Sequence, residues 1–318
     1  MKRYISIPAS VLAVIAASSC DYTFDLKDFD SDPALFIECV PGVSDTTLIK
    51  VFVAEPLNSP ESSFGSIDRS KTEVSMEING QSVRVKRAEK DTWTMRENWF
   101  YVVEDFMPGD RVSVSASLDG IAPVTAETVV PEKFPECEVS IIPVSTQRHW
   151  VQVDADIKVH DTDAAQNYYG MQLIMHTSYN DMDNNPVERE EIMLMESSPY
   201  DDMSYVDKLM TVYGNGTERM IIWDGSAFAS GHVLMRMSDS IPDDGGSGHM
   251  IRFRFRLFRL SPELFRYYTA QYNTGNGSGT ESDLFSPPYN AYTNVHGGFG
   301  ILGAMTLSQT DWIELMEE

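Results

Sequence analysis

Apolar and polar residues alternate in short runs from Ala34 onward, which is the period-two pattern of half-buried β-strands. Asn79-Gly80 separates two of these runs and favours a two-residue hairpin turn, because both central positions of that turn need a positive φ. The predicted strands are Ala34–Cys39, Thr47–Ala54, Glu73–Ile78, Gln81–Lys86, Trp99–Val103, Arg111–Ala116 and Ala122–Val130. Short strands at this spacing, over about 100 residues, predict an immunoglobulin-like β-sandwich at residues 33–131.

A second β-rich region, residues 138–318, follows a Pro-rich linker at residues 132–137. Its predicted strands are Val139–Val144, Val151–Val159, Tyr169–Met175, Ile192–Met195, Met220–Trp223, Val233–Met237 and Ile251–Leu260. The region is longer than the first and has its own apolar alternation, so it predicts a larger, second β-sandwich domain.

The alternation is cleanest from Ile251 to Leu260. Phe253, Phe255 and Leu257 are predicted to face a core, while the other face carries a row of guanidinium groups. That row consists of Arg252, Arg254 and Arg256. The alternation changes phase at Phe258-Arg259, which indicates a β-bulge or the end of the strand.

The sequence predicts one helix, from the residues at its N-terminus. Ser261 is a good N-cap, Pro262 suits the first helical position, and Glu263 complements the positive end of the helix dipole. We therefore expect a helix over residues 262–272. The predicted fold class is all-β, with an N-terminal immunoglobulin-like sandwich followed by a larger β-sandwich domain with one capped helix.

The first twenty residues have the pattern of an export signal. Lys2 and Arg3 precede an apolar run, and small residues then lead to Cys20. This arrangement is typical of a bacterial lipobox, so residues 1–19 are interpreted as a lipoprotein signal peptide and Cys20 as the lipidated residue. The alternative is an ordinary cleaved signal with an unrelated cysteine. The apolar run is shorter than the roughly 20 residues that a membrane-spanning helix needs.

Residues 20–32 are predicted to form an acidic tether between the lipid and the first sandwich, since like charges repel and little can be buried. Acidic residues just after a lipidated cysteine resemble the signals that send Bacteroidetes lipoproteins to the cell surface. The expected location is therefore the outer membrane, lipid-anchored and facing the cell surface.

The formal net charge of −24 excludes some partners. Binding to a nucleic-acid backbone needs clustered Lys and Arg on the surface, and so does attachment to anionic lipid through a basic patch. Removal of residues 1–19 would make the chain still more acidic, because it would take away Lys2 and Arg3. We expect no nucleic-acid partner, and we expect the lipid alone to hold the protein at the membrane.

Besides Cys20, the chain has only Cys39 and Cys137. In an exported protein these two could form a disulfide that ties the first strand to the segment leaving the first domain. The alternative is that each is a small buried apolar residue.

Motifs for catalysis or metal binding are absent from the sequence. The histidines form no HxH, HxxxH or HExxH pair, and no GxSxG nucleophile elbow is present. Asp181, Asp183 and Asn185 have calcium-loop spacing, but Pro186 stands where such a loop needs Gly and Ile192 where it needs Glu. We expect no metal, no cofactor and no enzymatic activity.

An acidic, methionine-rich insertion spans residues 178–212. Core packing, an adaptable contact surface and a copper site are all compatible with its methionines. Aromatic, thioether and acidic side chains together are typical of a binding loop. The candidate binding residues are Met182, Met195, Tyr200, Asp201, Asp202 and Tyr205.

The C-terminal segment carries a Gly-rich motif after a tyrosine-rich helix. It resembles the Bacteroidetes lipoprotein family catalogued as domain of unknown function 4249, whose tails follow the pattern Pro-Phe-Ser-x-Pro, then Tyr-x-Asn-Ile-x-Gly-Gly-x-Gly-Ile-Phe-Gly. The matches are Phe285-Ser286, Pro288, Tyr292, Asn294, Gly297-Gly298, Gly300-Ile301 and Gly303. By its residues alone, the tail is interpreted as a structural clasp, because the glycines permit positive φ or close backbone approach.

Families of this kind are usually encoded beside TonB-dependent outer-membrane receptors. The resemblance therefore implies a surface lipoprotein that acts as a non-enzymatic binding accessory of a TonB-dependent nutrient uptake system. A structural or adhesive cell-surface protein is the first alternative, and a hydrolase is the second.

Overall fold

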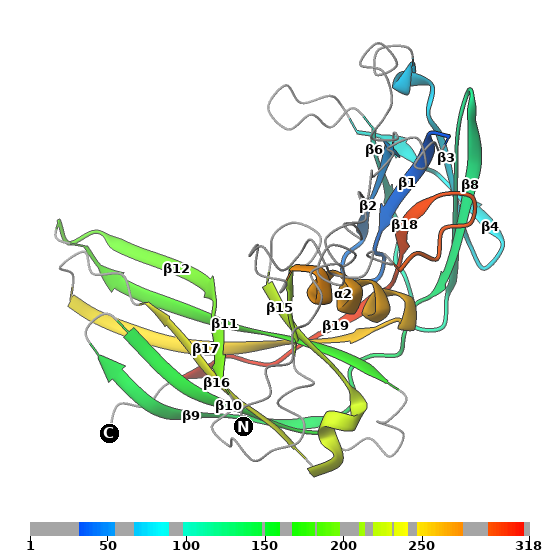
Figure 1. Ribbon diagram of the computed structural model, residues 1–318. Helices are drawn as coiled ribbons and strands as arrows, with labels where there is room; N and C mark the ends of the chain where they lie inside the picture. The colour runs from blue at the N-terminus through cyan, green and yellow to red at the C-terminus, as the bar shows by residue number, and fades with distance from the viewer. Residues whose placement is uncertain are drawn as a thin grey trace, which may run out of the picture.

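The computed structural model describes residues 32–54, 67–88, 98–147, 150–159, 167–181, 183–197, 210–213, 219–230, 232–240, 247–275 and 292–314. Two β-sandwiches lie side by side, and helix α2 (Pro262–Gly275) lies where they meet (Figure 1). The all-β prediction is confirmed. The helix begins where the sequence predicts and extends a few residues beyond the expected end.

The first sandwich consists of a five-stranded and a four-stranded sheet. The order of the first is β18 (Phe299–Leu302), β1 (Ala34–Cys39), β2 (Thr46–Ala54), β6 (Trp99–Val103), β5 (Lys86–Arg87). The order of the second is β4 (Gln81–Val83), β3 (Glu73–Ile78), β7 (Arg111–Leu118), β8 (Ile121–Val129). A short 3₁₀ turn, η3 (Arg69–Lys71), precedes β3. Asn79 and Gly80 both have positive φ, which confirms the predicted hairpin turn.

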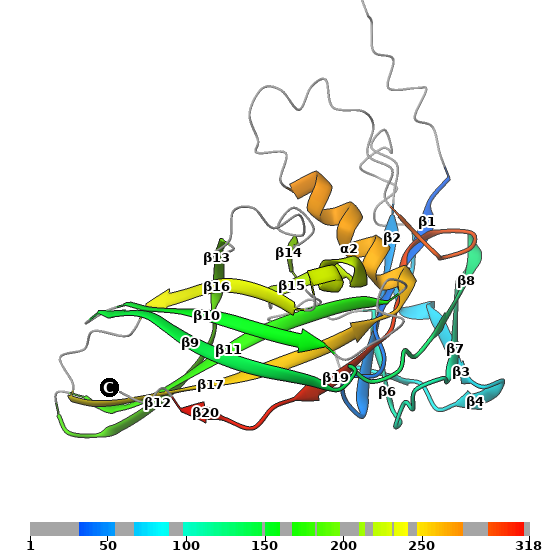
Figure 2. The same ribbon diagram turned by 90° about the horizontal axis from the view of Figure 1, so that it is seen from below.

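The second sandwich also consists of two sheets, one above the other in Figure 2. The first has the order β13 (Leu194–Ser197), β16 (His232–Ser240), β10 (Trp150–Val159), β9 (Cys137–Gln147). The second has the order β14 (Met210–Tyr213), β15 (Arg219–Asp224), β11 (Tyr168–Asn180), β17 (Ser247–Leu260), β19 (Met305–Gln309). In addition, β12 (Pro186–Ile192) pairs with β11 and β20 (Ile313–Glu314) with β17. A 3₁₀ segment, η6 (Gly225–Ser230), links β15 to β16.

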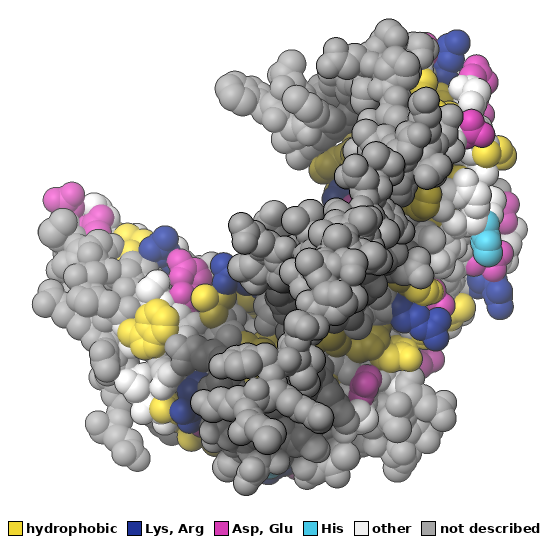
Figure 3. All heavy atoms as spheres, in the orientation of Figure 1, with side chains coloured by type: hydrophobic (Ala, Val, Ile, Leu, Met, Phe, Trp, Pro, Cys, Tyr) yellow, Lys and Arg dark blue, Asp and Glu magenta, His cyan; other side chains and the backbone are white. Residues whose placement is uncertain are grey.

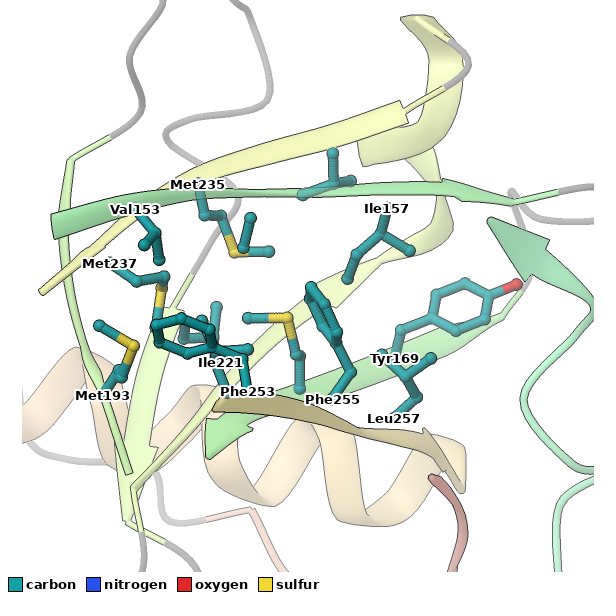
Figure 4. Close-up of a cluster of buried hydrophobic side chains, with 14 of the residues drawn as sticks. Val153, Ile157, Tyr169, Met193, Ile221, Met235, Met237, Phe253, Phe255 and Leu257 are labelled. Carbon is teal, nitrogen blue, oxygen red and sulfur yellow. The ribbon is translucent and has the colours of Figure 1, made fainter. Parts of the chain in front are cut away.

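The core of the second sandwich lies between these sheets. Alternate residues of each strand point inward, as Figure 4 shows for Val153 and Ile157 on β10 opposite Phe253, Phe255 and Leu257 on β17. Burying side chains of this size stabilises a fold by about 1.5–3 kcal/mol each. The predicted core face of β17 is confirmed.

The phase change at Phe258 is not a bulge. β17 pairs with β11 without a break from Thr177↔Ile251 to Tyr168↔Leu260. Phe258 and Leu260 are buried on the opposite face of the sheet, where they pack with Leu264 and Tyr268 of α2. The sequence pattern changes because α2 covers this end of the outer face, so both faces of the strand are buried there.

The C-terminal chain returns to the first sandwich. β18 pairs in parallel with β1, and Figure 1 shows the red β18 beside the blue β1. Val295, Leu302 and Ala304 are buried in the first core. The clasp interpreted from the tail is thus a real strand pairing, but it joins residues that the sequence assigned to the second domain, 138–318, to the domain at 33–131. Parallel pairing between chain ends leaves no local sequence signal.

Candidate functional site

A seam interrupts the seven-stranded sheet of the second sandwich. One edge of β11 pairs with β15 from Tyr168 to Met171 and with β12 from Ile174 to Asn180. Between these stretches, the Leu173 carbonyl accepts a hydrogen bond from the Met193 amide at 2.9 Å, and Gln172 Nε2 donates to the Arg219 carbonyl at 2.9 Å. The chain after β12 leaves this sheet here and continues as β13 in the other sheet, so β12 and β15 do not meet along β11.

A pocket of about 170 Å³ lies at this seam. Its methionines come from separate strands and connecting segments, and Figure 4 shows Met193 and Met237 beside Ile221 at this end of the core. The methionines that line it are Met171, Met193, Met195, Met220 and Met237. A cavity of about 150 Å³ lined by apolar side chains holds a benzene molecule, so this pocket is large enough for a small apolar group.

Among the residues that the structure describes, the lining of the pocket combines apolar side chains with three polar ones. Thioethers are polarizable and adapt to the shape of a guest. The polar side chains that line it belong to Gln172, Thr211 and Arg219. An amide, a hydroxyl and a guanidinium group can each form hydrogen bonds with a bound ligand.

The predicted arginine row lies on the outer face of the same sheet. In the β11–β17 register, Arg252 is opposite His176, Arg254 is opposite Ile174, and Arg256 is opposite Gln172. Directly paired residues share a face, and Gln172 also lines the pocket, so the row ends beside the seam. The stems of the arginines help to cover Ile174 and Gln172, which are buried although they point away from the core.

Trp312, on the segment between β19 and β20, organises the row. Its indole ring lies 4.7 Å from the guanidinium carbon of Arg252 and 4.0 Å from that of Arg254. The ring of His176 meets the same indole edge-on at 5.5 Å. Arg254 Nη1 donates to Gln309 Oε1 at 3.4 Å. Stacking on an indole fixes the plane of a guanidinium group while leaving its N–H groups available.

The buried Nε atoms of Arg252, Arg254 and Arg256 have no hydrogen-bond partner. Within the part of the chain that the structure describes, these three arginines form no ion pair with a carboxylate. Elsewhere the sheets pair their cations across strands: Arg236 binds Asp154 through two contacts of 2.9 and 3.2 Å, and Lys50 lies 3.3 Å from Glu38. Figure 3 shows acidic and basic side chains next to each other along β12 as well.

The outer face of the first sandwich carries exposed aromatic residues. Phe36 is paired in register with Phe299 on one side and with Phe52 on the other, and the Phe36 and Phe52 rings are 6.2 Å apart. Phe52 and Phe299 keep 44% and 51% of their surface exposed. On the same sheet, Lys50 lies over Trp99. Exposed aromatic residues in register on one face of a sheet are typical of a contact surface.

Of the candidate binding residues, Met195 lines the pocket, where it is partly buried against the core. Met182, Tyr200, Asp201, Asp202 and Tyr205 lie outside the described residues, as does the lipidation candidate Cys20. Pattern analysis of the sequence missed the pocket itself, because its methionines come from distant parts of the chain. Only their high frequency hinted at it.

The Asp181 carboxylate closes its own turn. Oδ1 accepts hydrogen bonds from the amides of Asp183 and Asn185, and the bonds from Asn185 lower the pKa of Asp181 most. This accounts for the oxygen spacing without a cation. Within the described ranges, no group of three or more His, Cys, Asp or Glu residues is placed to hold a metal ion.

Cys39 and Cys137 do not form a disulfide. Cys39 is fully buried in the core of the first sandwich, whereas Cys137 packs against the core of the second. Each thiol therefore belongs to a different domain, and the alternative of two separate apolar residues describes them. Burial raises the pKa of both thiols, that of Cys137 to about 11, with a smaller contribution from Glu136.

The fold and site define a two-sandwich β protein with a methionine-lined pocket and a cationic row. The model of the family described as "Domain of unknown function (DUF4249)" matches residues 20–311, and the chain belongs to this family. A comparison with curated proteins found no match. None of the helices in the described ranges is long and apolar enough to cross a membrane.

Proposed function

We propose that this protein is a lipid-anchored surface lipoprotein that binds a nutrient, without transforming it, for a TonB-dependent uptake system. The observation that carries the proposal is the seam pocket, which is built from thioethers, one amide, one hydroxyl and one guanidinium group. A lining of this kind can hold a ligand through apolar contacts and a few hydrogen bonds, which supports a binding role. An accessory that captures a nutrient requires these properties.

The location follows from the chain's beginning. Cys20 after small residues supplies the lipid attachment point, and the acidic residues behind it favour an extended tether. An anchored protein on a tether stays close to a membrane receptor and gains a high effective concentration for it, so even a weak contact between the two is occupied.

The aromatic surface of the first sandwich supplies a place for this receptor. Phe52 and Phe299 project from β2 and β18, the two strands that flank β1. Exposed aromatic side chains of this kind commonly contribute most of the energy of a protein interface. The pocket lies on the other sandwich, so a receptor bound at the phenylalanines leaves the pocket open to ligand.

The test is purification of the tagged protein from outer membranes in mild detergent, with identification of what comes with it. We expect a stoichiometric TonB-dependent receptor with the wild type. The double variant Phe52→Ser/Phe299→Ser should lose it, whereas Val129→Ser, an equally exposed apolar residue of the other sheet, should retain it. Cys20→Ser should move the protein into the soluble fraction.

Recovery of the wild type without a receptor from fully solubilised membranes would contradict a stable complex with a TonB-dependent receptor. Binding of that protein to a surface polymer would then favour the adhesive alternative. Turnover of any polymer or ester by the purified protein would favour the hydrolase and contradict a purely binding role.

A further inference from the structure

We infer that the arginine row is an anion-binding site, which takes a ligand carrying two or more oxyanion groups such as phosphates, sulfates or carboxylates. The inference deepens the proposed binding function, on which it rests, by giving the chemical class of the ligand. Its centre is Arg254 and Arg256, on the outer face of β17.

Charge balance is the first argument. The chain has twice as many acidic as basic residues, so carboxylates are available almost everywhere. Arg254 nevertheless has Ile174 opposite it and Arg256 has Gln172 and Gln309, all of them uncharged. Neighbouring guanidinium groups two residues apart on a strand lie about 6.7 Å from each other and repel. Among the described residues, Arg254 and Arg256 have this repulsion and no counter-charge, and an anion that arrives with the ligand explains the arrangement.

The position of the nearest charges locates the site. His176 lies opposite both Arg252 and Glu190, and Arg252 lies opposite Glu314 of β20. His176 is also 3.8 Å from Glu188. Acidic side chains therefore surround the Arg252 end of the row, and a further anion is favoured only toward Arg254 and Arg256.

Preorganisation is the second argument. Trp312 stacks on Arg254, and Gln309 holds its Nη1 end, so the guanidinium group is fixed before a ligand arrives. A fixed planar fork binds an oxyanion through two parallel hydrogen bonds and loses little freedom in doing so. The Nε atoms of the row are buried, so the donors that a ligand meets are the terminal Nη groups.

The row and the pocket adjoin through Gln172, which lines the pocket and pairs with Arg256. The ligand class that suits both features has oxyanion groups at one end and a small apolar group at the other. The arginine row is the end of the site that binds the oxyanion groups, and the test addresses only this end.

The test is calorimetric titration of the purified soluble chain with tripolyphosphate and with tricarballylate, and with orthophosphate as the single-oxyanion comparison. We expect saturable binding of at least one multiply charged probe, and weaker binding of orthophosphate. Arg254→Gln and Arg256→Gln should each weaken that binding by about tenfold, because each removes a charge-assisted fork. Arg254→Lys keeps the charge without the fork, so its affinity should lie between those of the wild type and Arg254→Gln.

Arg189→Gln is the matched control. It removes the same charge from β12, which lies on the other side of β11, and from the opposite face of the sheet, where Arg189 pairs with Glu191 at 3.5 Å. It should leave the affinity within about twofold of the wild type. The thermal midpoint of each variant, measured without ligand, reports its folding.

Absence of saturable binding of both multiply charged probes to the folded wild type would overturn the inference. So would an equal loss of affinity in Arg189→Gln, which would show a general charge effect. A fall in the thermal midpoint of Arg254→Gln with unchanged affinity would make the row a structural element. None of these results depends on the receptor, so the anion site can fail while receptor association stands.

Discussion

The carbonyl oxygen of Ile37 occupies the place where a Cβ atom at Gly300 would lie. This relationship holds β18 against β1, since only glycine lets the two backbones approach so closely. Gly300 also has a φ of +106°, a region that other residues avoid. The tail motif therefore encodes a contact between the two ends of the fold.

Replacing Gly300 by Ala should consequently cost more than strain in the backbone alone. Gly120 has a φ of +83° and no atom within 4 Å of its would-be Cβ, so Gly120→Ala measures the backbone penalty, about 1–2 kcal/mol. Gly300→Ala adds the clash with Ile37 and should lower the free energy of unfolding by about 3 kcal/mol or more. Urea unfolding of both variants makes the comparison. Equal losses of unfolding free energy in the two variants would contradict a close approach of the backbones at Gly300.

The cluster under α2 joins the sandwiches. Leu264 and Tyr268 pack with Phe258 and Leu260 of the second sandwich and with Ile301 of β18 in the first. We expect the wild type to unfold in one calorimetric transition. Leu264→Ala, at a fully buried position, should lower stability by about 2–5 kcal/mol and separate the transition into two.

Gln271→Ala, at an exposed position of the same helix, is the control for Leu264→Ala and should change little. Two transitions in the wild type would show that the cluster does not couple the sandwiches. A single transition in Leu264→Ala, shifted to lower temperature, would place the coupling in β18 instead.

The sequence predicted what depends on local pattern. Strands with clear alternation, such as those around Val112 and Val153, were found as expected, and Ser261 does cap the helix: its Oγ accepts from the Leu264 amide at 3.3 Å. The arginine row was also predicted, because it is a property of one strand. The lack of counter-charges around it among the described residues was not predicted, since that depends on which strands lie beside β17.

Features made by distant segments could not be predicted. β18 is short and pairs with a strand far away in sequence, and the edge strand β12 is mostly charged and so lacks an apolar period. The pocket needs Met171, Met193 and Met237 to meet across a break in a sheet. Nothing in the local sequence encodes a break of that kind, which arises because β11 is longer than either strand at its edge.

The pocket should bind a small apolar molecule. Toluene is of suitable size for about 170 Å³, and saturating toluene should raise the thermal midpoint of the wild type, because a ligand of the native state stabilises it. Met195→Phe places a rigid ring at the lining and should abolish the rise. Ile142→Phe adds a ring at an exposed position of β9 and should retain it. A rise of equal size in Met195→Phe would place the toluene elsewhere.

The thiols give a prediction with a defined pH dependence. At pH 7 the thiolate fraction of Cys137 is about one in ten thousand, given a pKa of about 11, and each unit of pH should raise its alkylation rate by iodoacetamide about tenfold until that pKa is approached. Cys39, which is fully buried, should react only after unfolding. The pKa of Cys137 in the folded protein lies above the ordinary thiol value of 9.0, so the protonated thiol favours the fold. This contribution is complete below about pH 9 and is lost as the pH rises toward 11.

Mass spectrometry after alkylation in denaturant without reductant should find both residues modified. If both stayed unmodified until a reductant was added, the thiols would be paired, and the separation of Cys39 and Cys137 into two cores would be wrong.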